Sequence, residues 1–198
     1  MTMTNCTVTD NTTTGGSGGG IFINGGTTVN LGNSIVSANN GTNPNISGTV
    51  ASQGNNMINN VTGTAGTVGS DITGGAVTLN LGALANNGGS TQTHAVLAGS
   101  SAIDGGSNAL ATAASLTTDQ RGGAFNRTIS GTVDIGSFEF GNVVACVVLT
   151  APAEVTNTWI GCNSSDWSDA ANWSANAIPT ATDIIYVPTA AVNELIIN

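Results

Sequence analysis

The residues of this chain that could do chemistry are few, and its two arginines stand first among them. Arg121 and Arg127 are the only arginines, and lysine is absent. Asp119 and Asp134 flank them in a chain whose formal net charge is −9. In so acidic a chain, guanidinium groups are expected where carboxylates converge, because the two groups form charge-assisted hydrogen bonds. We therefore predict structural salt bridges in which Arg121 or Arg127 pairs with Asp119 or Asp134.

The remaining ionisable residues do not predict catalytic machinery. A polysaccharide lyase needs a basic side chain, often beside calcium held by aspartates, and a glycoside hydrolase needs two close carboxylates. Before Leu79 the only carboxylates are Asp10 and Asp71, which lie near opposite ends of that stretch. His94, the single histidine, lies within TQTHAVL beside an apolar strand, where a hydrogen-bonded structural role is favoured. We expect no catalytic residue and no hydrolase or lyase activity.

Metal-ligating patterns are also missing from the sequence. The three cysteines, Cys6, Cys146 and Cys162, have no CxxC spacing, so with one histidine they form no zinc set. Whether Cys146 and Cys162 pair in a disulfide stays open. Three aspartates recur at even intervals, at positions 104, 119 and 134, but the neighbouring arginines account for ionised carboxylates without a metal. We predict neither a metal nor a cofactor.

The three tryptophans form the last candidate site. Trp159, Trp167 and Trp173 lie close together in the sequence. Flat indole faces can stack on sugar rings, which makes these residues possible glycan-stacking groups. The alternative is that they form the core of a C-terminal module, and this is favoured because the chain has few other aromatic residues to fill a core.

Composition indicates the kind of fold that must position these residues. The chain of 198 residues contains 29 Thr, 28 Gly and 25 Asn, and Thr, Val and Ile together supply nearly a third of it. Such a mixture favours β-strands joined by tight turns. The acidic charge excludes a nucleic-acid partner, and the longest apolar run, around Val143 to Leu149, is too short to cross a membrane. The sequence therefore predicts an all-β protein without a transmembrane segment.

Internal repeats specify that fold further. The string NCTVTDN at 5–11 realigns with NSIVSAN at 33–39, and a looser copy, NNMINN, begins at Asn55. The spacing between these copies, together with their short apolar strands, indicates a right-handed parallel β-helix. This is a solenoid in which each coil lies about 4.8 Å from the next. The alignment places Val8, Val36 and Ile58 in the core.

The same alignment brings asparagines to equivalent turns. Asn5, Asn33 and Asn55 lead the three copies. Stacked asparagines can form a ladder of side-chain amide hydrogen bonds along the solenoid. Asparagine also tolerates the left-handed backbone conformation of turns, and the sequence leaves these two explanations open.

From about Leu79 the sequence contains strings that resemble those of a known family. The strings LGALANNGGSTQTHAVLAGSSAIDGGSNA, TDQRG and GTVDIGSFEF resemble the choice-of-anchor Q domain, a family of bacterial surface proteins built on parallel β-helices, over roughly Ser34 to Phe140. The strings GGGI and FIN are similar to repeats of polymorphic outer-membrane proteins. The resemblance implies a cell-surface or secreted location, with Arg121 and Arg127 in a compact closing segment.

A second resemblance covers the C-terminal part. The string TWIGCNSSDWSDAANWSANAIPTATDIIYVP resembles a Trp-rich module of secreted Bacteroidetes-type surface proteins. We therefore expect β-helix coils at 1–78, a closing segment at 79–140, a linker at 141–158 and a truncated Trp-rich β module at 159–198. We also expect the chain to be a fragment, with any signal and anchor outside it.

These observations together predict a non-catalytic, adhesin-like β-helix that displays or anchors other modules. Its partners would be extracellular glycans or the surface of a host or neighbouring cell. The alternatives are a fragment of a carbohydrate-active β-helix enzyme with its active coils upstream, and a carbohydrate-binding module that uses the Trp cluster. Exposed strand edges at the first coil also predict edge-to-edge self-association of the isolated chain.

Overall fold

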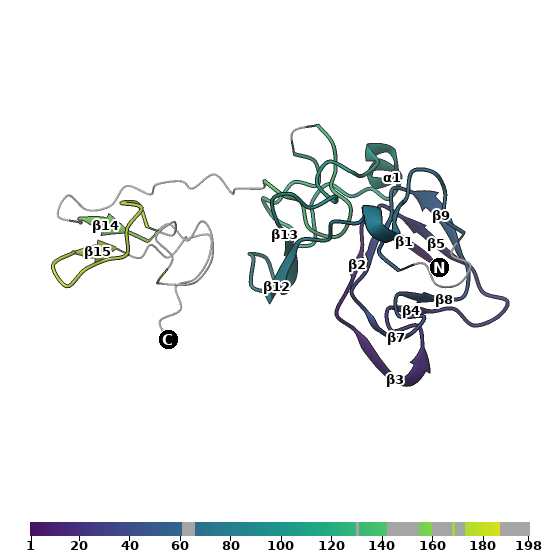
Figure 1. Cartoon of the computed structure of the whole chain (residues 1–198). Helices are drawn as coiled ribbons and strands as arrows, with labels where there is room; N and C mark the ends of the chain where they lie inside the picture. Colours follow the sequence, from purple (N-terminus) through teal and green to yellow (C-terminus); the bar gives the residue numbers. More distant parts are fainter. Residues whose placement is uncertain (61–65, 130, 142–154, 160–167, 169–172, 187–198) are drawn as a thin grey trace.

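A computed structural model describes residues 1–60, 66–129, 131–141, 155–159, 168 and 173–186 (Figure 1). Regular structure in these ranges is almost entirely β, with one short helix, α1 (Asn108–Ala113), and one 3-10 turn, η1 (Gly74–Ala76). None of the helices in the described ranges has the length and hydrophobicity that a membrane span requires.

The N-terminal part is a parallel β-solenoid, as the repeats predict. Strands of successive coils stack in the orders β1-β5-β9, β2-β6-β10-β11, β3-β7 and β4-β8, and every neighbouring pair is parallel. The strands are β1 (Thr2–Thr4), β2 (Thr7–Val8), β3 (Thr12–Ser17), β4 (Ile21–Phe22), β5 (Val29–Gly32), β6 (Ile35–Val36), β7 (Asn40–Thr42), β8 (Ile46–Ser47), β9 (Val50–Gly54), β10 (Met57–Ile58) and β11 (Ile72–Thr73).

The core register follows the spacing of the sequence repeats. Val8 is the register partner of Val36, and the neighbouring pair Met57 and Ile35 extends the same stack to the third coil. Val36 and Ile58 are fully buried in one apolar cluster, against which Val8 packs. The predicted inward positions of these three residues are confirmed. Each fully buried side chain of this type stabilises the fold by roughly 1.5–3 kcal/mol.

The coils shorten along the stack. Thr7 of β2 pairs with Ile35 of β6, whereas Met57 of β10 pairs with Ile72 of β11, so the later coil takes little more than half the chain length of the first. Successive residues of a strand point to opposite faces, and in β6 and β10 both faces are buried: Val36 and Ile58 lie in the core of the coils, whereas Ile35 and Met57 lie in a second apolar cluster. The sharp turns between strands use Asn and Gly in left-handed conformations.

The closing segment follows the last coil and packs against the side of the stack (Figure 1). It begins with an antiparallel hairpin of β12 (Leu81–Ala85) and β13 (Thr93–Val96), and α1 follows. An apolar cluster joins Ile35 and Met57 of the coils to Val96, Ile135 and Phe138 of the closing segment. The solenoid and the closing segment therefore share a hydrophobic contact.

The C-terminal part contains one further strand pair. Strands β14 (Asn157–Thr158) and β15 (Ile185–Tyr186) are parallel. Strand β14 occupies the end of the range predicted as a linker.

Candidate functional site

The closing segment contains a buried polar network that begins with Arg121 and Asp119. Arg121 Nη2 lies 2.6 Å from Asp119 Oδ2, and Arg121 Nε donates to both carboxylate oxygens at 3.2 and 3.0 Å. Both residues are at least nine-tenths buried. This is one of the pairings that the sequence predicts. Because both charges are desolvated, the hydrogen bonds between them have to be short and well aligned for their attraction to offset the desolvation penalty of the pair.

Two aromatic rings complete the surroundings of Arg121. The guanidinium carbon lies 4.0 Å from the centroid of the Phe125 ring and 3.8 Å from that of Phe138. Each such cation–π contact contributes on the order of 0.5–2 kcal/mol. Arg121 Nη2 also donates to the carbonyl of Glu139 at 2.9 Å. Arg121 therefore holds three parts of the closing segment together.

Arg127 has a different partner from those predicted. Its Nη2 lies 2.6 Å from Glu139 Oε2, and its Nη1 donates to the carbonyl of Gly136 at 3.1 Å. Neither Asp119 nor Asp134 forms an ion pair with Arg127 in the described ranges. Glu139 was not predicted, because the aspartates that flank the arginines are nearer in sequence, although Glu139 lies in the same motif, DIGSFEF, as Asp134.

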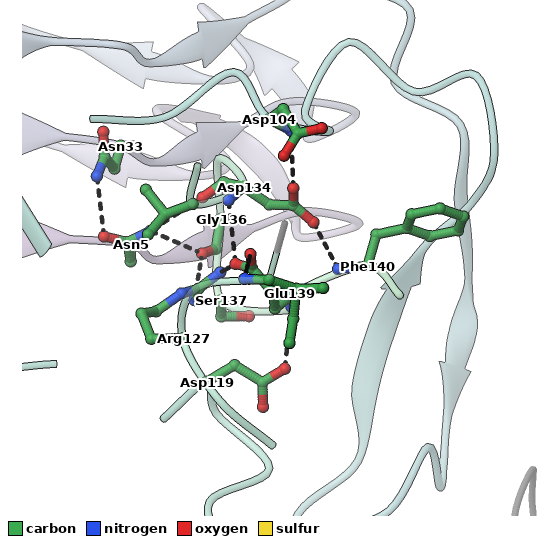
Figure 2. A network of polar contacts seen from close by, with 12 residues as sticks. Asn5, Asn33, Asp104, Asp119, Arg127, Asp134, Gly136, Ser137, Glu139 and Phe140 are labelled. Atoms are coloured by element: carbon green, nitrogen blue, oxygen red, sulfur yellow. Dashed lines mark hydrogen bonds and ion pairs between the residues drawn. The ribbon is translucent and has the colours of Figure 1, made fainter. Parts of the chain in front are cut away.

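The two buried carboxylates of this motif accept backbone hydrogen bonds (Figure 2). Asp134 accepts from the N–H groups of Asp104, at 2.8 Å, and Phe140. Glu139 accepts from the N–H groups of Ile129 and Asp134, at 3.1 and 3.0 Å. Desolvation by burial raises the pKa of both carboxyls above the ordinary value, against the opposing effect of these donors. The oxygens of both carboxylates are used as hydrogen-bond acceptors within the fold. The two carboxylates are therefore badly placed for acid–base chemistry.

Asparagine side chains attach this network to the coils. Asn5 Nδ2 donates to the carbonyl of Asp134 at 3.0 Å, and Asn33 Nδ2 donates to Asn5 Oδ1 at 3.1 Å. The backbone N–H of Gly136 donates to the carbonyl of Asn33 at 2.8 Å. Gly136 has a φ of 100°, and a Cβ atom there would lie 2.7 Å from Ile35 Cδ1 and from Thr7 Oγ1. Only glycine fits this close approach of the closing segment to the coils.

The three predicted turn asparagines share a left-handed backbone but not a continuous ladder. Their φ values are 52° for Asn5, 50° for Asn33 and 56° for Asn55. Asn5 and Asn33 form one rung of the predicted ladder. Asn55 does not extend it, since its Nδ2 donates to the carbonyl of Gly105 at 3.0 Å. The shorter third coil and the nearby closing segment give Asn55 a different partner.

A second chain of asparagine hydrogen bonds, which the sequence did not predict, also links the coils. Asn11 Nδ2 donates to Asn39 Oδ1 at 3.0 Å, Asn39 Nδ2 to Asn45 Oδ1 at 3.1 Å, and Asn45 Nδ2 to Asn59 Oδ1 at 2.7 Å. Asn11 and Asn39 have the same sequence separation as Asn5 and Asn33. That shared separation was the signal that could have identified the contact between Asn11 and Asn39, whereas the other two contacts join residues that are 6 and 14 positions apart.

The remaining ionisable candidates have structural contacts. His94 Nδ1 lies 2.9 Å from the carbonyl of Gly82 and 4.0 Å from Asp10 Oδ2. Asp71 accepts from the hydroxyl of Ser52 at 2.7 Å and from the backbone N–H of Asn56 at 2.9 Å. Within the described part of the chain, no three His, Cys, Asp or Glu residues are grouped as metal ligands would be.

The tryptophans that the structure describes are core residues. Trp159 is 0% exposed and Trp173 is 1% exposed, and their rings meet edge to face with centroids 5.1 Å apart. Buried indole faces cannot stack on a sugar, so the glycan-stacking prediction is wrong for these two residues. Trp167, Cys146 and Cys162 lie outside the described residues.

A pocket of about 440 Å³ lies where the first coil meets the closing segment. The turn from Thr4 to Thr7 forms one side, and residues that include Thr118, Gln120, Arg127 and Ser137 form the other. Cys6 is in the coil side, and burial raises the pKa of its thiol, so the thiol stays protonated at neutral pH. The pocket therefore offers hydroxyl and amide groups and no activated nucleophile.

Comparison with known proteins adds no assignment to this geometry. Protein-family models, curated proteins and solved structures were each searched, and none matches the chain.

Proposed function

We propose that this chain is a non-catalytic, adhesin-like β-solenoid of a bacterial cell-surface or secreted protein, in which it displays or anchors other modules. The observation that carries the proposal is that both arginines stabilise the interior of the closing segment. Each guanidinium group is buried in an ion pair within the closing segment, and that segment is bonded to the coils. The cationic side chains stabilise the closing segment, which packs against the side of the coils, and are not presented to a substrate.

The carboxylates of the coils support the same conclusion. Asp71 accepts hydrogen bonds from its neighbours, and Asp10 lies on a different coil next to His94. A hydrolase would need two carboxyls about 5–10 Å apart around one sugar bond, and a lyase would need a free base. The described coils offer neither arrangement.

The surface location rests on the likeness of the closing strings to the choice-of-anchor Q family and on the kind of stability that the fold has. Hydrogen-bonded ladders and apolar stacks do not weaken with ionic strength, whereas exposed ion pairs do. A solenoid with few charges is therefore suited to an environment of changing salt.

Labelling of cells tests the location. An antibody raised against the purified chain would be applied to intact and permeabilised cells of the bacterium that encodes it. The proposal expects equal labelling of both preparations and protease sensitivity of the chain on intact cells. Labelling that requires permeabilisation would overturn the surface assignment.

An activity assay tests the non-catalytic part separately. The purified chain should release no reducing ends from a panel of neutral and acidic polysaccharides. Turnover that is lost on replacing His94 would make a carbohydrate-active enzyme the better explanation.

A further inference from the structure

Asparagine is followed directly by glycine at three positions of the chain, Asn24, Asn40 and Asn87. At such a pair the amide nitrogen of the glycine can attack the side-chain carbonyl carbon of the asparagine, because glycine has no Cβ atom to obstruct the approach. The attack closes a five-membered ring that includes the backbone of the asparagine. It therefore requires a backbone that can change conformation and a side-chain amide that the fold does not hold. The three positions share this chemistry and differ in how the fold holds them.

The fold holds the side-chain amide of Asn87 in place. Asn87 Nδ2 donates to the carbonyl of Thr93 at 2.7 Å and to the hydroxyl of the same residue at 3.1 Å. The backbone N–H of Gly88, whose nitrogen would have to attack, donates to Asn86 Oδ1 at 3.2 Å. A Cβ atom on Gly88 would lie 2.6 Å from the Phe125 ring, so the backbone is closely packed here. Ring closure at Asn87 requires that these contacts break.

Asn40 is held by its strand. It is the first residue of β7, and its backbone N–H donates to the carbonyl of Asn11 at 2.8 Å. Gly41 has a φ of 129°, and a Cβ atom there would overlap Thr13 of the neighbouring strand β3. The side chain of Asn40 is exposed, and its Oδ1 accepts from the Gly41 N–H at 3.1 Å. Ring closure would nevertheless require the backbone of β7 to leave the sheet.

Asn24 is held by neither kind of contact. It lies two residues after β4 and begins an exposed loop, 24–28. A Cβ atom on Gly25 would meet no other atom within 4 Å. The Gly25 N–H faces the amide of Asn24, donating to Oδ1 at 2.9 Å, and Asn24 Nδ2 donates to no described residue. The attacking nitrogen and the amide carbon are therefore adjacent, exposed and outside any strand.

We propose that Asn24 is a site of spontaneous deamidation, and that it reacts faster than Asn40 and Asn87. Hydroxide removes the amide proton of Gly25, and the nitrogen then attacks Asn24 Cγ. The bond from Cγ to Nδ2 breaks, and this nitrogen takes a proton from water and leaves as ammonia. Water opens the ring at either carbonyl, which yields aspartate or isoaspartate. The net reaction consumes one water molecule and releases one ammonia molecule.

The modification adds a carboxylate to the first coil. Asn24 lies two residues after Phe22 of β4, and in the described ranges the strands of this coil have no partner on their outer edge. Charged side chains oppose pairing between chains at such an edge. Deamidation would therefore weaken self-association of the chain as it ages.

The experiment incubates the purified chain at mildly alkaline pH in water enriched in heavy oxygen and follows the three asparagines by peptide mass spectrometry. The heavy label marks products that form during the incubation and not during the later digestion. We expect the Asn24 product to accumulate at least about tenfold faster than the other two, which corresponds to about 1.4 kcal/mol in activation free energy. In concentrated urea this difference should largely disappear, because the fold no longer holds Asn40 and Asn87. Equal rates in the folded chain, or a difference that urea leaves unchanged, would overturn the proposal.

A pair of glycine variants tests the ring-closure step. Gly25→Ala should slow the reaction at Asn24 by about tenfold, because the added Cβ atom obstructs the attacking nitrogen. Gly75 is also exposed, with open space around it and no left-handed φ, as at Gly25. Gly75→Ala therefore adds the same methyl group elsewhere and should leave the Asn24 rate unchanged. An Asn24 product that forms equally fast in Gly25→Ala would indicate direct hydrolysis of the side-chain amide and would contradict the proposed attack by Gly25.

Discussion

The side-chain amide of Asn33 donates a hydrogen bond of 3.1 Å to Asn5 Oδ1, one coil earlier in the chain. Asn33 also exchanges side-chain hydrogen bonds of 2.8 Å with Ser107, its Nδ2 donating to the carbonyl and its Oδ1 accepting from the N–H. Asn5 in turn donates to the carbonyl of Asp134. One buried amide therefore connects two coils with the closing segment.

Replacing this amide should destabilise the contact between the coils and the closing segment. Asn33→Ala removes three hydrogen bonds of a fully buried side chain, and we expect a loss of about 2–4 kcal/mol in the free energy of unfolding, measured with urea. Asn43→Ala is the matched control, because Asn43 also has a left-handed backbone, with a φ of 45°, but no side-chain hydrogen bond to another described residue. Equal losses in the two variants would show that only backbone strain matters.

Gly136 gives a second matched comparison. Gly136→Ala places a Cβ atom 2.7 Å from Ile35 Cδ1 and Thr7 Oγ1, whereas Gly131, with a similar φ of 105°, has open space around it. Both substitutions strain the backbone by about 1–3 kcal/mol, and only the first adds overpacking, which costs roughly another 1–3 kcal/mol. The melting temperature of Gly136→Ala should therefore fall further than that of Gly131→Ala. Similar melting temperatures would mean that the side chains of the coils can move to accommodate the added methyl group.

Removing Arg121 tests the buried ion pair. Arg121→Ala leaves the Asp119 carboxylate buried without its cation, and we expect a loss of about 3–5 kcal/mol in the free energy of unfolding. The double variant Asp119→Ala with Arg121→Ala should be less destabilised than the sum of the single variants, since it leaves no unpaired charge. Additive losses would instead assign Arg121 to packing between Phe125 and Phe138 alone.

Much of the coil structure was predictable because it is encoded by local repetition. Val8 and Val36 are one coil apart in the sequence, and the parallel register makes them neighbours on adjacent strands. Asn55 has a side-chain contact that the sequence repeats do not predict. It keeps the turn conformation of Asn5 and Asn33, but its side chain bonds to Gly105, far outside the repeats.

The closing segment was harder to predict for the same physical reason. Its contacts join residues with no common period, as in the pair Arg127 and Glu139 and in the placement of Arg121 between two phenylalanine rings. The composition indicated that the arginines would be paired. The choice between Asp134 and Glu139 depends on the path of the irregular backbone, which short-range patterns do not specify.

The buried carboxyls predict an unusual pH dependence. Burial raises the pKa of Asp134 and Glu139 in the folded state, so just above the ordinary carboxyl pKa the folded chain binds more protons than the unfolded chain. These two groups therefore make stability rise as the pH falls from neutral into that window. Asp183 has a lowered pKa, and its contribution is lost only at pH values below the window.

Urea unfolding across this pH range measures the effect. The urea midpoint of the wild-type chain should increase from neutral pH toward about pH 5, and Glu139→Gln should reduce the slope because it removes one of the two titrating groups. A wild-type midpoint that falls steadily on acidification would contradict the raised pKa values.

The outer edge of the first coil predicts self-association of the isolated chain. Each of its strands, β1 to β4, pairs with a strand of the second coil and with no other strand in the described ranges. Unpaired backbone N–H and C=O groups on such an edge can pair with a second chain, and charged side chains oppose that pairing. Phe22 of β4 is 64% exposed on this coil.

Phe22→Lys should therefore lower the apparent mass that light scattering reports at high protein concentration. Ile184→Lys adds the same charge at a residue that is 54% exposed and far from the first coil in sequence, so it controls for the change in net charge. Association of the wild-type chain that Phe22→Lys reduces and Ile184→Lys leaves intact would locate the contact at the first coil. If the wild-type chain stays monomeric at all concentrations, the strand edge is already protected, because an open parallel edge with an exposed phenylalanine beside it would be a template for pairing.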